Sequence, residues 1–230
     1  MELTLLAAAL TGAVSVWATN RILGDRIAVD RPTDALIGAA ATGLLAGRLA
    51  AMIAAGVNPL TSPGDILIVR GGVSTAFASI GASAVLVWTH RSTLPRALDH
   101  LAPAAAAGLA GWHGGCLWRG TCLGTSSDLP WAMTSAGTSV SRHPVELYAA
   151  LAFLMAVPLL VRFIDRPWVA SGAALALAGS VRLATEPLRL SIVGGPVGWY
   201  GAAVAAGTLG AVLGHSRMRT RPPGPPSIEM

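Results

Sequence analysis

The residues with the greatest chemical capacity gather in one short polar segment. In "RHPVELY", residues 142–148, an arginine, a histidine, a glutamate and a tyrosine fall within seven positions. The segment runs directly into an apolar stretch that carries no charge until Arg162. A guanidinium matches phosphate oxygens with its planar fork. The segment therefore predicts the polar rim of an anion-binding cavity at the mouth of an apolar helix.

Further charged residues lie inside or at the end of apolar runs. Arg48 lies within one run, and Arg182, Glu186 and Arg189 follow one another at the end of another. A charge in hydrocarbon costs about 2.5–3.5 kcal/mol on insertion scales, so such residues usually face a cavity or a partner. Arg182 and Glu186 are four residues apart on one helical face, and we expect them to pair. Structural ion pairs, with arginine side chains snorkelling to the interface, are the alternative.

The composition is that of a membrane protein. The 230 residues are 53% hydrophobic and 12% charged, about half the charged share of ordinary soluble domains. The net charge is +5, but the arginines stand between apolar runs, as at loop ends beside a membrane, so we expect no nucleic-acid partner. The sequence predicts an all-α, polytopic membrane protein.

A membrane span needs about 20 apolar residues. We expect about seven transmembrane helices in a single domain over residues 1–214, followed by a basic, proline-rich cytoplasmic tail over 215–230. The loops that would share one side with this tail carry most of the arginines, which predicts an N-terminus outside the cytoplasm. The expected spans are 3–19, 34–55, 72–89, 97–117, 144–163, 168–187 and 195–214.

A second group of reactive side chains follows the fourth expected span. His113 is followed by two glycines, and Cys116 and Cys122 are six positions apart. The histidine is a candidate base or an inert, hydrogen-bonded helix end. The cysteines are candidates for a disulfide, for a thiol pair or for two buried small residues, and we expect them to lie close together. Two cysteines and one histidine do not supply the four ligands of a structural zinc site, so we expect no metal.

Several segments, in order and in spacing, resemble the prolipoprotein diacylglyceryl transferase family. The resemblance runs from about residue 36 to about residue 205, and "RHPVELY" and "VRLATEPLR" are its most specific pieces. It implies an enzyme of the bacterial inner membrane that acts in lipoprotein biosynthesis. Such an enzyme moves a diacylglyceryl group from phosphatidylglycerol to the lipobox cysteine thiol of a preprolipoprotein, and glycerol phosphate leaves. Its partners would be the anionic phospholipid and the preprolipoprotein signal peptide, and no cofactor is expected.

The chain departs from the family pattern mainly in the signature loop. Where the family has an arginine, two asparagines and a glutamate, this chain has His113, Cys116, Arg119 and Thr121 in that order. Where the family has a further histidine, this chain has Ala76. Cys116 and Cys122 fall on the cysteine positions of a variant branch of the superfamily, so the chain resembles a divergent, cysteine-containing member. Two alternatives stay open: a catalytically altered phospholipid-binding accessory protein, and a thiol-based membrane protein.

The resemblance implies catalytic roles for His113 and Arg189. For His143, the alternative to substrate binding is a packing or capping role at the helix start. For Tyr148, the alternative is the role of an aromatic residue at the membrane interface. We expect the arginines to converge on one cavity that has His113 on its wall, with Glu186 holding Arg182. The expected substrate-binding residues are Arg48, Arg142, His143, Tyr148, Arg182 and Glu186.

Overall fold

The computed structural model describes residues 2–67, 72–118, 122–135, 137–190 and 195–219. Helices dominate this part of the chain, as predicted, and the strands it contains form one small antiparallel hairpin with Met133 opposite Arg142. The long helices are α1 (Glu2–Leu23), α2 (Pro32–Ala54), α4 (Thr75–His90), α5 (Leu94–Cys116), α6 (Val145–Val161), α7 (Val169–Thr185) and α8 (Val197–Arg219). The short elements are η1 (Gly24–Arg26), α3 (Gly64–Leu67), β1 (Met133–Thr134), β2 (Ser141–Arg142) and η3 (Glu186–Leu188).

Three of the described helices are long and apolar enough to cross a membrane, judged by length and composition. The segments are Leu6–Arg26, Pro32–Ala54 and Val197–Ser216, and α4 and α6 are shorter apolar helices. Helix α5 is long, but Arg96 and Asp99 lie within it, and α7 has only 17 residues, with Arg182 in its last turn. The long helices therefore agree in position with the expected spans, while fewer of them have the length and apolarity of a full span.

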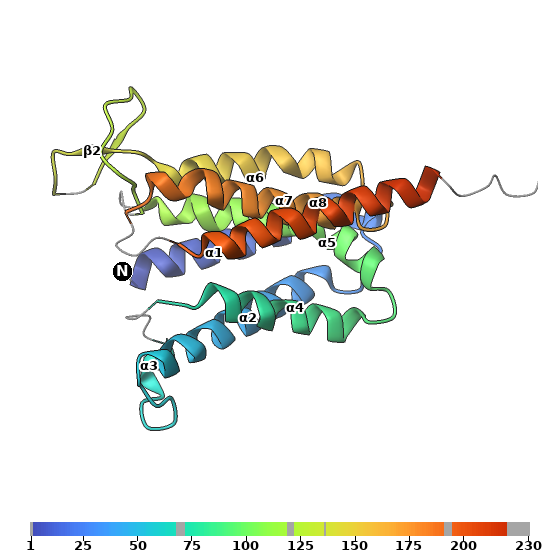
Figure 1. Cartoon of the computed structure of the whole chain (residues 1–230), viewed down its shortest axis with the longest axis horizontal. Helices are drawn as coiled ribbons and strands as arrows, with labels where there is room; N and C mark the ends of the chain where they lie inside the picture. The colour runs from blue at the N-terminus through green and yellow to red at the C-terminus, as the bar shows by residue number, and fades with distance from the viewer. Residues whose placement is uncertain (1, 68–71, 119–121, 136, 191–194, 220–230) are drawn as a thin grey trace, which may run out of the picture.

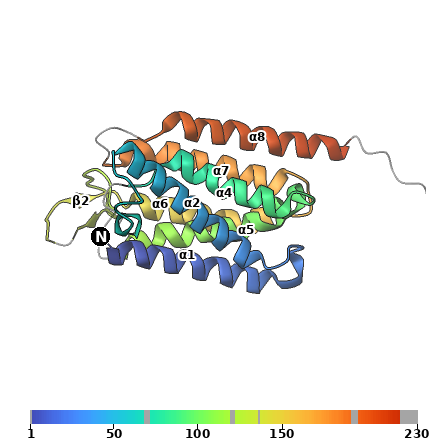
Figure 2. The same cartoon turned by 90° about the horizontal axis from the view of Figure 1, so that it is seen from below.

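The long helices lie side by side in one bundle (Figure 1). Helix α1 packs on α5, α2 on α4, α5 on α6, and α7 on α8. The N-terminus lies at the end of the bundle that carries the hairpin and α3, and α8 ends at the other (Figure 1). Figure 2 shows α8 lying along α7. The hairpin end and the opposite end thus present different loops, and the polar residues of 142–148 lie at the hairpin end.

Small residues let α1 approach α5 closely, as is common between helices in lipid. The Thr11 hydroxyl donates to the carbonyl oxygen of Gly111 at 2.7 Å. A Cβ at Gly115 would collide with the Thr11 hydroxyl and would lie 2.7 Å from the Cα of Ala8. The absence of a side chain at Gly115 therefore sets how close α1 comes to the last turn of α5, where His113 lies.

A buried carboxylate fixes α7 against α5 at the other end of the bundle. Asp99 is fully buried, and it accepts hydrogen bonds from the backbone N–H groups of Trp168, at 2.6 Å, and Ser171, at 2.8 Å. The Ser171 hydroxyl donates to the same carboxylate at 2.8 Å. The first N–H groups of a helix have no partner within the helix. Asp99 supplies that partner from α5, so α7 starts at a defined position.

Neighbouring glycines provide a matched test of the α1–α5 contact. We expect Gly115→Ala to lower the free energy of unfolding by about 1–3 kcal/mol, the usual range for overpacking. Gly114→Ala should leave it unchanged or raise it by up to about 1 kcal/mol, because a Cβ at Gly114 meets nothing within 4 Å and alanine favours the helix. The measurement is thermal unfolding of both variants in detergent. Equal effects would contradict the close contact at Gly115.

Candidate active site

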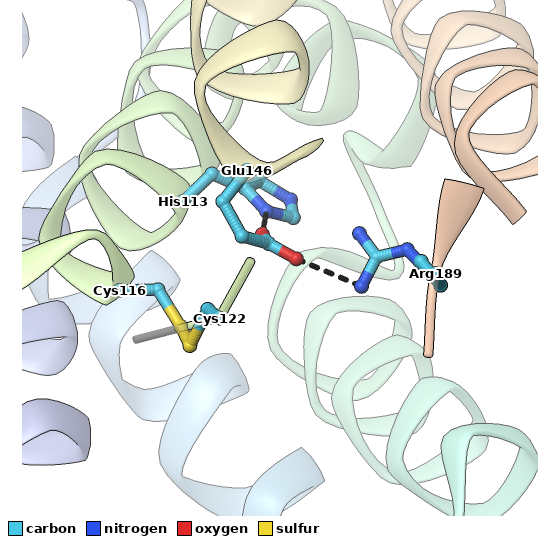
Figure 3. Close-up of a disulfide and its surroundings, with 5 residues drawn as sticks. All are labelled: His113, Cys116, Cys122, Glu146 and Arg189. Atoms are coloured by element: carbon cyan, nitrogen blue, oxygen red, sulfur yellow. Dashed lines mark hydrogen bonds and ion pairs between the residues drawn. A yellow bond between two sulfur atoms is a disulfide. The ribbon is translucent and has the colours of Figure 1, made fainter. Parts of the chain in front are cut away.

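A buried carboxylate joins two other polar side chains at the hairpin end of the bundle. One oxygen of Glu146, Oε2, is in hydrogen-bond contact with Nδ1 of His113. The other, Oε1, lies 2.8 Å from Nη1 of Arg189 (Figure 3). Glu146 is only 6% exposed and His113 5%. A carboxylate this deeply buried needs partners, and here the two partners come from different elements, the end of α5 and the residue after η3.

The ends of two helices bring His113 and Glu146 together. Pro144 precedes α6, and Glu146 lies in the first turn of this helix, where the helix dipole favours a negative charge. His113 lies in the last turn of α5, where the dipole favours a positive one. The Phe153 ring stacks on the His113 ring, with centroids 5.6 Å apart and planes 10° apart. Stacking and hydrogen bond together fix the orientation of the imidazole.

This orientation defines which nitrogen of His113 can act as a base. A carboxylate can only accept, so Nδ1 of His113 carries the proton that it donates to Glu146. Nε2 is then the unprotonated nitrogen of the neutral ring. Among the described residues Nε2 has no hydrogen-bond partner. The geometry therefore provides a histidine with an oriented, available proton acceptor.

Arg189 keeps binding capacity beyond its ion pair. Its Nη2 is buried and has no hydrogen-bond partner among the described residues. The backbone N–H of Arg189 donates to the carbonyl oxygen of Glu186 at 3.1 Å, which closes the η3 turn. A buried donor without a partner is costly, so this nitrogen is suited to an incoming acceptor such as a phosphate oxygen.

The expected ion pair between Arg182 and Glu186 is not formed in the described part of the chain. Arg182 donates from Nη2 to the Tyr200 hydroxyl at 3.0 Å, with its guanidinium 5.3 Å from the ring centroid. The Glu186 carboxylate is turned toward Gly195, where a Cβ would lie 2.5 Å from Oε1, and Oε2 is buried with no hydrogen-bond partner among the residues that the structure describes. The backbone keeps α-helical spacing up to Glu186, whose N–H donates to the carbonyl oxygen of Arg182. The pair is not formed because the Arg182 side chain binds Tyr200 of α8 instead.

The cysteines form a disulfide next to this network, as Figure 3 shows. The Cα atoms of Cys116 and Cys122 are 5.9 Å apart, so the expected proximity is confirmed. Beyond Cys122, the Gly124 N–H donates to the carbonyl oxygen of His143, and the Thr125 N–H to that of Leu188, both at 2.8 Å. The disulfide thus links the end of α5 to a loop segment that hydrogen-bonds to His143 and Leu188.

The remaining residues of 142–148 form a second cluster. Arg142 donates from Nη1 to the carbonyl oxygen of Gly124 at 3.2 Å. The Tyr148 hydroxyl accepts from Nε1 of Trp131 at 2.9 Å and lies 3.3 Å from Nδ1 of His143. None of these described contacts reaches Arg189. In the described part of the chain Arg142, Arg182 and Arg189 have different partners, and their convergence on one cavity stays a prediction.

Arg48 is bound to backbone beyond its own helix. It is 5% exposed, and its guanidinium donates to the carbonyl oxygens of Asp65, at 2.8 and 3.0 Å, and Gly72, at 3.0 Å. These bonds hold the segment around α3 against α2. These hydrogen bonds explain, without any ligand, why a charged residue is tolerated within an apolar run. A substrate-binding role of Arg48 therefore stays a prediction.

Sequence reasoning gave Glu146 no role of its own, although this residue joins His113 to Arg189. The sequence signal for such a role was a single carboxylate in the first turn of an otherwise uncharged helix. An isolated charge at such a position usually has a partner. Tyr200 and Trp131 were also missed. Both are aromatic residues whose polar atoms bind expected site residues, and sequence alone does not distinguish them from interfacial aromatics.

Comparisons with known proteins identify relatives. Residues 3–193 match the family model described as prolipoprotein diacylglyceryl transferase. A protein of Pseudoalteromonas translucida (strain TAC 125), named phosphatidylglycerol–prolipoprotein diacylglyceryl transferase, is 31% identical over 128 residues, which are 52% of this chain and 48% of that protein. A protein of the same name from Methylobacillus flagellatus is 36% identical over 124 residues, 51% of this chain and 48% of that protein. The chain spans about half the length of the curated relatives it matches.

The buried network predicts a large difference between two glutamates. We expect Glu146→Leu to lower the free energy of unfolding by about 3 kcal/mol, because it leaves Arg189 and His113 without their shared partner. Glu186→Leu should cost less than about 1 kcal/mol, because it removes a buried carboxylate oxygen for which the described part of the chain provides no partner. Thermal unfolding in detergent compares the variants. Similar losses would show that the Glu146 contacts contribute little.

Proposed function

The chain belongs to the prolipoprotein diacylglyceryl transferase family, and we propose that it transfers a diacylglyceryl group from phosphatidylglycerol to the cysteine thiol of a preprolipoprotein. The observation that carries this proposal is the continuous network from His113 through Glu146 to Arg189. It provides a proton acceptor at one end and a partly unpaired cation at the other. A transfer from a phosphate ester to a thiol requires both.

His113 is proposed to act on the thiol. A thiol becomes a nucleophile when it loses its proton, and Nε2 of His113 is the nitrogen available to accept it. Glu146 holds the ring by Nδ1 and stabilises the imidazolium that forms, as in other histidine–carboxylate pairs. The thiolate sulfur then forms a bond to the glycerol carbon of the diacylglyceryl group.

Arg189 is proposed to act on the leaving group. The bond between that carbon and the phosphate oxygen breaks, and glycerol phosphate leaves with the bonding electrons. Charge grows on the phosphate as this happens, and a fixed guanidinium stabilises it more in the transition state than in the ground state. Nη2 of Arg189 is the donor that would meet this charge, since it has no partner within the described ranges of the chain. Arg182 and Arg142, at the same end of the bundle, would supply further positive charge.

A lipid-binding protein without transfer activity is the second candidate. The observation that favours it is the ion pair of Arg189 with Glu146, which neutralises part of the charge that a phosphate would meet. Replacement of a family histidine by Ala76 has the same implication. Such a protein would bind phosphatidylglycerol but leave the lipobox cysteine unmodified, and direct measurement of transfer distinguishes the two candidates.

We also propose that all seven long helices cross the membrane, in a single domain that ends at about residue 214. The hairpin end would face outward and the basic tail would lie in the cytoplasm of a bacterial inner membrane. The loops after α1, α4 and α6 carry arginines, as cytoplasmic loops do. A disulfide at the hairpin end fits an oxidising compartment.

Transfer can be tested in bacterial cells depleted of their own diacylglyceryl transferase. We expect expression of this chain to add a diacylglyceryl group to lipobox cysteines, detected by mass spectrometry of a reporter lipoprotein. His113→Gln should lower the transfer rate by about 10²–10⁴-fold, the usual contribution of a general base. Arg189→Lys should also lower it, because lysine keeps the charge and loses the fork.

Arg91→Gln is the matched control, because Arg91 follows α4 at the opposite end of the bundle. This variant should transfer as the parent does. Bare lipobox cysteines in cells whose membranes contain the parent chain would refute the enzyme proposal. Retained binding of phosphatidylglycerol in that case would favour the lipid-binding candidate.

The proposed orientation gives a separate prediction. Reporter fusions after residues 93 and 217 should both report the cytoplasm. After reduction, a membrane-impermeant maleimide added outside the cell should label Cys122, which is exposed at the hairpin end. A fusion that reports the outside, or labelling only in broken cells, would contradict the orientation.

A further inference from the structure

A groove lies at the end of the bundle opposite the disulfide. It has a volume of about 420 Å³, within the usual range of ligand pockets. Its walls come from the connection between α6 and α7 and from the last turns of α8, and they include Phe163, Arg166, Val169, Val212 and His215. The groove therefore combines an apolar wall with two basic side chains, and it shares none of its lining with the network around Glu146.

Arg166 has binding capacity that no described residue uses. Its guanidinium lies 5.1 Å from the centre of the Phe163 ring, which fixes its position. It takes part in none of the hydrogen bonds or ion pairs formed by the described residues. The neighbouring acidic residue, Asp165, is directed toward His100, with the nearest atoms 3.8 Å apart. The planar donors of Arg166 therefore remain available for a phosphate.

The apolar wall has the position that a lipid chain needs. Val212 is 58% exposed on α8, beside the buried Val169 at the start of α7. Helix α8 has a segment of spanning length that ends at Ser216, so the groove lies at the basic end of that segment. His215 and Ser216 lie about one helical turn beyond Val212 on the same helix. The lining of the groove thus changes from apolar to polar along its length. This order matches that of a lipid, whose apolar chain leads to a polar headgroup.

A close backbone contact fixes the shape of the groove. A Cβ at Gly214 would collide with the carbonyl oxygen of Pro167. Glycine at this position lets the end of α8 lie directly against the connection that carries Arg166. Trp168, the next residue, is held in turn by its hydrogen bond to Asp99 at 2.6 Å. Arg166 and the end of α8 are therefore placed by packing that exists without a ligand.

We infer that this groove binds an anionic membrane phospholipid, with the phosphate against Arg166 and His215 and an acyl chain along Val212 and Phe163. Basic pockets between membrane helices are suited to anionic headgroups, because charge attraction adds to apolar contact. This lipid would be a bound structural lipid and no substrate, since the groove lies at the opposite end of the bundle from His113. The inference is independent of the proposed transfer activity.

The test uses phosphatidylglycerol that carries a diazirine in the chain, incorporated into nanodiscs with the full chain. After illumination, mass spectrometry of peptides locates the label. We expect label in residues 163–169 and 211–216 with this probe, and much less with the matching phosphatidylcholine probe. Arg166→Gln should raise the probe concentration needed for half-maximal label by about fivefold, as expected for one basic residue near a membrane surface. Label near Glu146 should not change.

Arg91→Gln is the matched control, because Arg91 also stacks on an aromatic ring, that of Trp88 at 5.8 Å, and directly follows the last residue of α4. In this variant the probe should label the groove to the same extent as in the parent chain. Val212→Trp, which fills the apolar wall and leaves both basic residues, should also reduce the label. Equal labelling by the two probes, an unchanged Arg166→Gln variant, or an equal loss in Arg91→Gln would overturn the inference.

Discussion

The arrangement of the hairpin end depends on one buried charge. Glu146 lies in an apolar bundle, and a single buried carboxylate there would be costly without partners. His113 and Arg189 supply them from the end of α5 and from the residue after η3. Because each partner must reach the same carboxylate, the ends of α5, α6 and α7 are constrained to meet. The interaction that makes this charge tolerable is also the one that assembles the proposed chemistry.

Packing of small residues supports this arrangement. Gly115 lets α1 reach the last turn of α5, and the disulfide ties that turn to the loop segment beside η3. Asp99 sets the start of α7 from the other end of the bundle. These constraints act on α5, which carries His113, and on α7, which leads through η3 to Arg189. Positions of the three side chains thus follow from backbone contacts and do not rely on a ligand to order them.

The two ends of the bundle hold their arginines in different ways. At the hairpin end, Arg182 and Arg189 have side-chain partners, Tyr200 and Glu146. At the opposite end, Arg91 and Arg166 stack on aromatic rings and take part in none of the described ion pairs. A guanidinium engaged by a carboxylate is suited to a site where charge changes during a reaction. One that rests on an aromatic ring at the rim of the bundle is suited to a lipid headgroup.

The sequence by itself determined the class of the protein, the places of its long helices and the pool of reactive residues. Apolar length and arginine spacing are local properties, so α1, α2 and α8 follow from them, and motif order indicated the family. Tertiary structure decided which residues meet. Helical spacing predicted a pair between Arg182 and Glu186, but Arg182 binds Tyr200 of α8 instead, and the Glu186 carboxylate is turned toward Gly195. Nothing local marks Glu146 as the partner of His113, 33 residues earlier, because that contact depends on how three helix ends pack.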